Sequence, residues 1–173
     1  MEQKRNILDL SNAIKCTPEN TKCSQGARSE RLKMIENFEL KFDVKLPSSY
    51  ISYITSVDWA PKIFDEINYL NNTGIKLDLV EINYELRNED ISYPTIPNYL
   101  IAISRGHDDN YFCFDTRYIS DGEYPLAYWS SYTPFYKELL EQEFSNIKLA
   151  QALFTYIAPD FATYFYNILC DKE

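Results

Sequence analysis

The chain has 173 residues, enough for one hydrophobic core, and 16% of them are aromatic. Its formal net charge is -9, and residues 1–33 carry seven basic and four acidic side chains, so the rest of the chain, with ten basic against twenty-two acidic, is near -12. An acidic surface repels the phosphates of nucleic acid and attracts a basic protein partner. The acidity can also be explained by solubility alone.

Residues 1–27 are expected to form a polar N-terminal extension, slightly basic and with only a short apolar patch. Asp9 and Asn12 interrupt that patch, so no secretion signal is readable, and the default expectation is a cytoplasmic protein. Residues 149–170 are the most apolar region, but the polar residues and the proline among them make this region too polar to span a bilayer. We therefore expect no contact with a membrane.

Two helices are predicted after this extension. Apolar residues recur at helical spacing from Ser29, a suitable N-cap, to about Lys41. Pro47 suits the first position of a second helix, which ends before Asp58, because its missing N–H would have no partner there. The apolar stripe of the first helix consists of Leu32, Ile35 and Phe38.

The following part of the chain mixes loop, strand and helix signals. Residues 57–61 are expected to form a loop that contains Trp59. The D-x-x-E spacing of Asp78 and Glu81 resembles a capping box and predicts a third helix up to about Asn88. Two short strands are predicted between these parts, over residues 63–70 and 75–77.

The middle of the chain is predicted to form a small antiparallel meander. Its turns are polar, and Gly106 and Gly122 lie where the backbone must reverse. The three predicted strands cover residues 99–104, 111–115 and 125–129.

The middle strand of this meander has two different faces. Alternation places Phe112 and Phe114 on one face, which we expect to be core. Tyr111, Cys113 and Asp115 fall on the opposite face. We expect that second face to carry the function.

Helices are predicted again towards the C-terminus. Asp160 is a suitable N-cap for the last of them, and Pro159 separates it from the helix before. The predicted ranges are residues 133–144, 147–157 and 160–169. An order without regular strand–helix–strand alternation predicts an α+β fold with a mainly antiparallel sheet of about 4–6 strands, flanked by helices.

Cysteine spacing and the common motifs exclude several kinds of site. No C-x-x-C pair is present, which indicates free thiols in a reducing compartment. The sequence also lacks the glycine-rich phosphate loops, the zinc-protease motif and the hydrolase elbow, so we expect no cofactor. The cysteines are Cys16, Cys23, Cys113 and Cys170.

One short stretch, residues 107–115, offers candidates for catalysis. A hydrolase would use Cys113 as nucleophile and His107 as base, with Asp109 as the orienting group. A metal site would instead use Asp108, Asp109 and Asp115 as oxygen ligands of a hard cation. Turn residues that cap backbone N–H groups explain the same pattern, and we favour this interpretation. We therefore expect neither an enzyme nor a metal site.

Several short pieces of sequence occur in an order typical of one family. They are residues 35–38, 46–50, 101–103 with Asp109, 114–116 and 125–129. By these pieces the chain resembles the SUKH superfamily, the Smi/Knr-type domain, over roughly residues 29–144. Accordingly we expect a Smi/Knr-like domain over residues 28–145, followed by a C-terminal helical extension, residues 146–173, packed on the same domain.

The resemblance implies an α+β fold without catalytic activity. Bacterial members look like immunity proteins that bind a toxin, often a nuclease, and fungal relatives act as regulatory interaction modules. The resemblance therefore implies a non-enzymatic immunity protein that occludes the active cleft of a basic, nuclease-type toxin. The alternatives are a regulatory interaction module, or a hydrolase centred on His107, Asp109 and Cys113. Residues 57–61 lack the glycines that members usually carry in this loop, which points to a different partner.

The residues expected to contact the partner are those whose presence is explained least well by a role in folding. A tryptophan in a loop commonly packs back on the core, and charged turn residues are commonly only solvated. Asp115 and Arg117 flank a strand end and are expected to pair with each other. The expected partner-binding residues are Trp59, Asp108, Asp109, Asp121 and Glu123.

Overall fold

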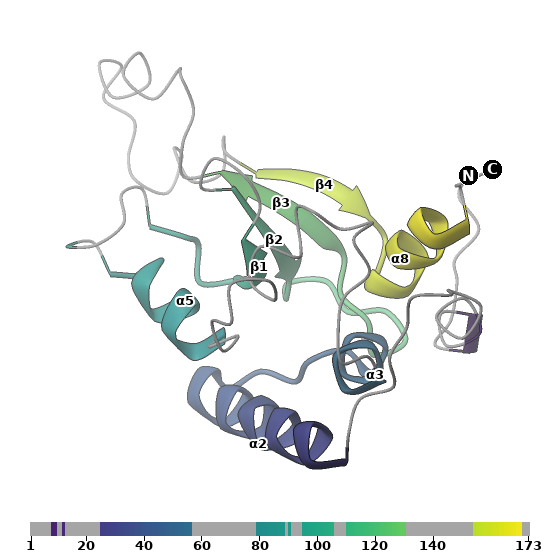
Figure 1. Cartoon of the computed structure of the whole chain (residues 1–173). Coiled ribbons are helices and arrows are strands. Elements are labelled where there is room, and N and C mark those ends of the chain that lie inside the picture. Colours follow the sequence, from purple (N-terminus) through teal and green to yellow (C-terminus); the bar gives the residue numbers. More distant parts are fainter. Residues whose placement is uncertain are drawn as a thin grey trace.

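The computed structural model describes residues 8–9, 12, 25–56, 79–88, 90, 95–105, 110–130 and 154–170 (Figure 1). Within these residues, helices and strands form an antiparallel sheet with helices packed around it, which confirms the predicted α+β fold. The elements are α2 (Gln25–Phe42), α3 (Ser48–Ser56), α5 (Leu79–Glu85), β1 (Leu100–Arg105), β2 (Asn110–Asp115), β3 (Leu126–Ser130), β4 (Phe154–Ala158) and α8 (Phe161–Cys170).

The described strands form a four-stranded sheet in the order β1-β2-β3-β4, with every neighbouring pair antiparallel. The predicted meander is therefore confirmed for β1, β2 and β3, each within one residue of its expected bounds. Cys113 in β2 lies opposite Ala102 in β1 and Ala127 in β3, which fixes the register of the sheet.

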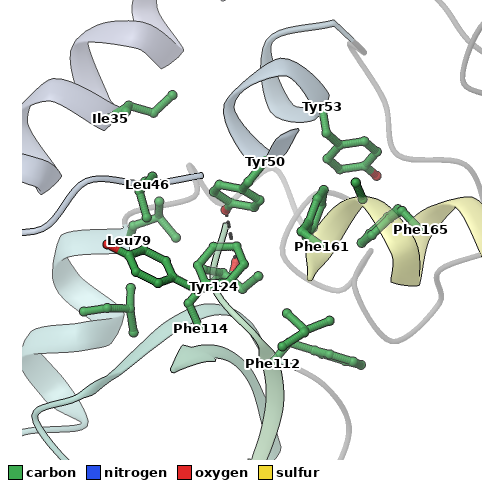
Figure 2. Packing of buried hydrophobic residues seen from close by; sticks show 14 of the residues in the cluster. Ile35, Leu46, Tyr50, Tyr53, Leu79, Phe112, Phe114, Tyr124, Phe161 and Phe165 are labelled. Carbon is green, nitrogen blue, oxygen red and sulfur yellow. Dashed lines mark hydrogen bonds between the residues drawn. The ribbon is translucent and has the colours of Figure 1, made fainter. Parts of the chain in front are cut away.

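The first face of the sheet carries the main core, as expected. Phe112 and Phe114 point into a cluster that also receives side chains from α2, α3 and α8 (Figure 2). The ring of Tyr50 in α3 meets Phe114 edge-on at 5.4 Å between centroids and Phe161 of α8 at 5.2 Å. Edge-to-face contacts of this kind stabilise a core by roughly 0.5–1.5 kcal/mol each beyond the burial of area.

The second face of the sheet is also core, so the expectation that it carries the function is wrong. Tyr111, Cys113 and Trp129 on this face are buried and pack in a second cluster with Leu86 and Ile96. Alternation along a strand tells which residues share a face, but not whether another part of the chain covers that face. Because core residues cover both faces at these positions, we expect functional groups at the edges of the sheet and in its connections.

The helices before the sheet agree with the prediction in type, but the N-cap expected at Ser29 is wrong, because α2 begins four residues earlier. Ile35 and Phe38 of the predicted apolar stripe are buried, while Leu32 is exposed. α3 begins directly after Pro47, whose carbonyl accepts a hydrogen bond from the Ile51 N–H at 3.0 Å. In Figure 1 both helices lie below the sheet, on the side of the first cluster.

The third helix, α5, is joined to the outer edge of β1 by side chains. The Asn83 Nδ2 donates to the Ala102 carbonyl at 2.7 Å, and the Ala102 N–H donates to the Asn83 Oδ1 at 2.9 Å. The Arg87 Nη2 donates to the Leu100 carbonyl at 2.6 Å. Asn83 and Arg87 thus occupy backbone groups of β1 that a neighbouring strand would otherwise take.

The helix expected over residues 147–157 is wrong for its last part, because residues 154–158 form β4 and pair with β3, while residues 147–153 lie outside the described residues. The segment Phe154–Ala158 is rich in β-branched and aromatic residues, and its pairing partner lies far away in the sequence, so local periodicity missed it. The next helix is confirmed as α8, and the Asp160 Oδ1 caps it by accepting from the Thr163 N–H at 2.7 Å.

Several predicted elements lie outside the described residues. These are the loop at residues 57–61, the strands at 63–70 and 75–77, and the helix at 133–144. Among the helices that the structure does describe, none has the length and apolar character required to cross a membrane.

Candidate interaction surface

The connection between β2 and β3, residues 116–125, carries large apolar side chains that face solvent. Tyr118 is 56% exposed and Ile119 is 65% exposed. Tyr156 of β4, at 50%, lines the same surface pocket as Tyr118. Exposed apolar side chains are ordinary when scattered, but a group of them at one place marks a site of interaction. We call Tyr118, Ile119 and Tyr156 the aromatic rim.

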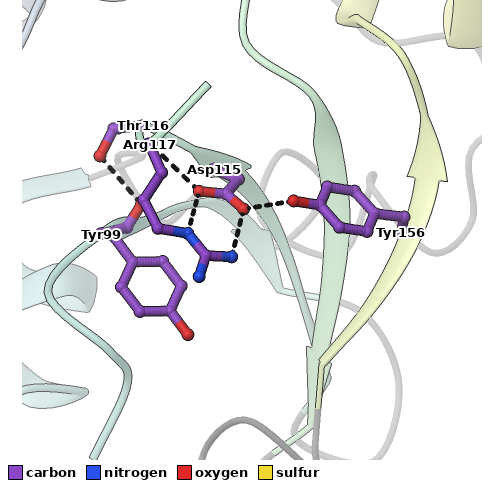
Figure 3. A network of polar contacts seen from close by, with 5 residues as sticks. All are labelled: Tyr99, Asp115, Thr116, Arg117 and Tyr156. Carbon is purple, nitrogen blue, oxygen red and sulfur yellow. Dashed lines mark hydrogen bonds and ion pairs between the residues drawn. The ribbon is translucent and has the colours of Figure 1, made fainter. Parts of the chain in front are cut away.

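An ion pair between a buried carboxylate and a partly exposed arginine fixes the start of this connection to the sheet. Asp115, at the end of β2, is fully buried and accepts from the Arg117 Nη2 at 2.7 Å, Nε at 3.0 Å and backbone N–H at 3.1 Å (Figure 3). The Tyr156 hydroxyl donates to the same carboxylate at 2.7 Å. The expected pairing of Asp115 with Arg117 is confirmed, and Tyr156 joins β4 to it.

Two further contacts hold the same segment against the residues before β1. The N–H and Oγ1 of Thr116 both donate to the Tyr99 carbonyl, at 2.9 and 3.0 Å (Figure 3). The Arg117 guanidinium lies 3.8 Å from the centroid of the Tyr99 ring and 5.3 Å from that of Tyr118. The position of Arg117 is therefore set by a carboxylate and by two aromatic rings.

A tight turn fixes the other end of the connection. Ser120 and Glu123 exchange backbone hydrogen bonds at 3.0 and 3.1 Å, and Asp121 and Gly122 between them have φ values of 57° and 77°. Positive φ at both central positions is the geometry of a type I′ turn, for which Asp-Gly is a preferred pair. The sequence analysis placed Gly122 at such a reversal, and this is confirmed.

Glu123 anchors this turn to the beginning of α3. Its carboxylate accepts from the Ser49 Oγ at 2.5 Å and from the Ser49 N–H at 3.2 Å. A carboxylate at the first turn of a helix satisfies an N–H that has no partner within the helix. The connection is thus tied to the fold at both ends, and the exposed side chains of Tyr118 and Ile119 lie between the two ties.

The charges of these anchors follow from their surroundings. Burial acts to raise the pKa of Asp115, but the hydrogen bonds from Arg117 and Tyr156 outweigh it and hold that pKa below its usual value. The same contact raises the pKa of Arg117, while burial and the bond to Asp115 raise the pKa of Tyr156 to about 12. Burial raises the pKa of Glu123, against the opposing hydrogen bonds from Ser49. Asp115 and Arg117 therefore form an ion pair at neutral pH.

A shallow, open pocket of about 580 Å³ lies beside the connection. Two tyrosine rings and two prolines contribute much of its wall, and none of the described residues that line it carries a carboxylate, an amine or an imidazole. Such a lining can hold an apolar or aliphatic group, but these residues supply no general acid, general base or activated nucleophile with which to transform one. Its lining residues are Tyr118, Pro125, Tyr156, Ile157, Ala158 and Pro159.

The structure describes two of the five residues predicted to contact a partner. Asp121 is exposed in the tight turn, and Glu123 is partly buried against Ser49. Their contact with a partner stays a prediction. Trp59, Asp108 and Asp109 lie outside the described residues, as does His107.

Cys113 does not have the surroundings of a nucleophile. Its thiol is fully buried, lies 3.5 Å from the Tyr111 carbonyl, and has its pKa raised by that burial. Asp115, the third acid of the metal alternative, is engaged by Arg117 and Tyr156. Within the described part of the chain, no group of three His, Cys, Asp or Glu side chains is placed to hold a metal ion. Cys113 is confirmed as a free thiol.

The aromatic rim was not predicted from the sequence. Tyr118 and Ile119 carried a usable signal, because they are apolar residues between the polar D-T-R and S-D-G stretches, where a loop is expected. Tyr156 carried none, since it fell in a segment assigned to a helix.

Comparison with protein families identifies a relationship that covers most of the chain. A model of the family SUKH_6, described as SMI1-KNR4 cell-wall, matches residues 32–147, which are 116 of the 173 residues. The matched part begins within α2, includes the meander and two residues of the aromatic rim, and ends before β4. No curated protein matches the chain.

Proposed function

Because the chain belongs to the SMI1-KNR4 family, we propose that it is an immunity protein that binds a cognate toxin and covers the toxin's active cleft. The observation that carries this proposal is the family match over residues 32–147. The SUKH superfamily, which the chain resembles in sequence, consists of interaction modules, and its bacterial members look like immunity proteins.

The charge of the chain supports a basic toxin as the partner. The net charge is -9, and the acidic residues lie mainly after residue 33. A nuclease attracts phosphates with a basic cleft, so protein carboxylates can occupy that cleft in place of nucleic acid. Opposite charges also speed the encounter of two proteins, which matters when a toxin must be captured before it acts.

The described residues also support binding rather than catalysis. The buried Cys113 thiol has no access to a substrate, and the Asp115 carboxylate is held by Arg117 and Tyr156. What the surface offers instead is a set of exposed aromatic and aliphatic side chains beside an open pocket, on a connection that is tied to the fold at both ends. Surfaces with rigid aromatic side chains are typical of protein recognition.

Co-expression tests this proposal. The proposal predicts a toxin domain encoded beside this chain, and this domain is induced in bacterial cells with and without the chain, and with a non-cognate toxin domain as control. We expect growth to be restored only for the cognate toxin, and the purified proteins to form a complex and suppress its activity in vitro. Absence of growth rescue together with absence of binding at micromolar concentration would contradict the proposal.

The second candidate is a regulatory interaction module, which the description of the matching family as SMI1-KNR4 cell-wall favours. The same experiment separates the two candidates. A regulatory module would leave growth unprotected from the toxin and the toxin's activity intact, while still binding a host protein.

A further inference from the structure

We propose that the aromatic rim, Tyr118, Ile119 and Tyr156, is the docking surface for the partner, and that the partner places a lysine or arginine side chain in the adjoining pocket. This inference rests on the proposed function, because it names the face of the molecule that meets the toxin. It adds residues that neither the family match nor the sequence analysis singled out.

The first support is exposure combined with rigidity. Tyr118 and Ile119 are more than half exposed, although the residues on both sides of them are tied to the fold. Arg117 is held by Asp115 on one side, and Glu123 is held by Ser49 on the other. A loop ordered before binding loses little conformational freedom when it docks, so its contacts contribute more fully to affinity.

The second support is the shape of the surface. The pocket takes its wall from the β2–β3 connection and from β4, and the rings of Tyr118 and Tyr156 both line it. It is open and shallow, which suits a side chain that projects from another protein better than an enclosed small molecule. Aromatic residues beside a pocket are the usual anchors of protein interfaces.

The third support is charge, and it selects the kind of side chain. Residues 115–123 contain three carboxylates and one guanidinium, and Asp115 already neutralises that guanidinium, Arg117. The other two carboxylates belong to Asp121, which is exposed in the adjacent turn, and to Glu123, which is partly buried and accepts hydrogen bonds from Ser49. A lysine or arginine can lay its aliphatic stem on tyrosine and proline surfaces while its charge is attracted by these acids and by the tyrosine rings. This preference agrees with the acidic charge of the whole chain.

Arg117 shows that a ring of the rim accepts a cation, since its guanidinium lies 5.3 Å from the Tyr118 centroid.

A control position that matches Tyr118 exists elsewhere on the molecule. Tyr84 in α5 is 58% exposed and has Lys41 at 5.6 Å from its ring centroid, but it does not line the pocket. Leu40 in α2, at 85% exposure, is the corresponding control for Ile119.

The test measures binding of the toxin domain encoded beside this chain, by titration calorimetry on the full-length proteins. We expect Tyr118→Ala to weaken binding by about 30-fold or more, the effect of losing one interface anchor, and Ile119→Ala to weaken it as well. The controls Tyr84→Ala and Leu40→Ala should bind like the wild type. Thermal unfolding of each variant shows that the fold is kept, since all four side chains are exposed.

Salt dependence tests the charge of the partner's side chain. Wild-type binding should weaken by about tenfold or more when the salt concentration rises from 50 to 500 mM, because attraction between exposed charges is screened. An affinity that is the same at both salt concentrations would overturn the assignment of a basic side chain to the partner.

Two further outcomes separate this inference from the proposed function. Wild-type binding with unchanged affinity in Tyr118→Ala and Ile119→Ala would overturn the docking surface and leave the proposed function in place. Failure of the wild type to bind would overturn both.

Discussion

Replacing Asp115 by asparagine removes the negative charge that holds the β2–β3 connection on the sheet. Asp115 is fully buried and accepts three hydrogen bonds from Arg117 and one from Tyr156. Charge-assisted hydrogen bonds contribute roughly 1.5–3 kcal/mol each. Because the Arg117 side chain is 37% exposed, water replaces part of the hydrogen bonding that Arg117 loses in the variant. Asparagine also keeps one acceptor oxygen. We therefore expect Asp115→Asn to lower the free energy of unfolding by about 2 kcal/mol at pH 7.

The pH dependence of this loss has a definite sign. The pKa of Asp115 in the fold is below its usual value, so the ionised carboxylate stabilises the protein above the unfolded pKa of about 3.9. This contribution disappears as the pH falls through the folded pKa. Asparagine has no such proton equilibrium, so the difference in stability between wild type and variant should shrink below about pH 4.

Urea unfolding followed by tyrosine and tryptophan fluorescence measures both effects, at pH 7 and at steps down to pH 2.5. Lys45→Ala is the control, because Lys45 pairs with Glu39 on the surface with 85% of its side chain exposed, and it should not change stability measurably. A loss below about 0.5 kcal/mol for Asp115→Asn at pH 7, or a loss that persists unchanged in acid, would refute the reasoning.

Three further predictions concern stability and reactivity. Asn83→Ala leaves the Ala102 N–H and carbonyl without their side-chain partner, and we expect a loss of about 3 kcal/mol in urea unfolding; a loss under about 1 kcal/mol would mean that water replaces the amide. Gly122→Ala should cost about 1 kcal/mol, because φ is 77° while no atom lies within 4 Å of the added Cβ; an unchanged midpoint in the same assay would contradict this backbone effect. The Cys113 thiol should react with a thiol reagent only as fast as the protein opens, because it is fully buried with a raised pKa; rapid labelling of the native protein, located by peptide mass spectrometry, would count against that burial.

The elements that the sequence predicted well are those whose signals are local. Alternation around Phe112 and Phe114, with the Asp-Gly turn after them, was enough to place β2 and β3 and to choose a core face. Pro47 marked the start of α3, and Asp160 marked the start of α8. Each of these signals acts within a few residues, so no knowledge of the rest of the fold was needed.

The parts that the sequence did not predict depend on contacts between distant segments. β4 exists because it pairs with β3, more than twenty residues earlier, and its apolar residues also fit a helical period. The second face of the sheet is core because Leu86 and Ile96 pack on Trp129 and its neighbours. In the same way, Tyr118 and Ile119 are exposed because Asp115 and Glu123 hold the chain around them, which no local pattern records.

The contact of α5 with β1 has a consequence for how the molecule behaves in a crowded cell. Incorporation of a foreign strand, or growth of a fibre, begins at a sheet margin that still has free amides and carbonyls. At Leu100 and Ala102 these groups are taken by Arg87 and Asn83. At these two residues α5 and Arg87 stand in the way of strand addition, and we expect a truncation or substitution that releases α5 to make the same strand prone to aggregation.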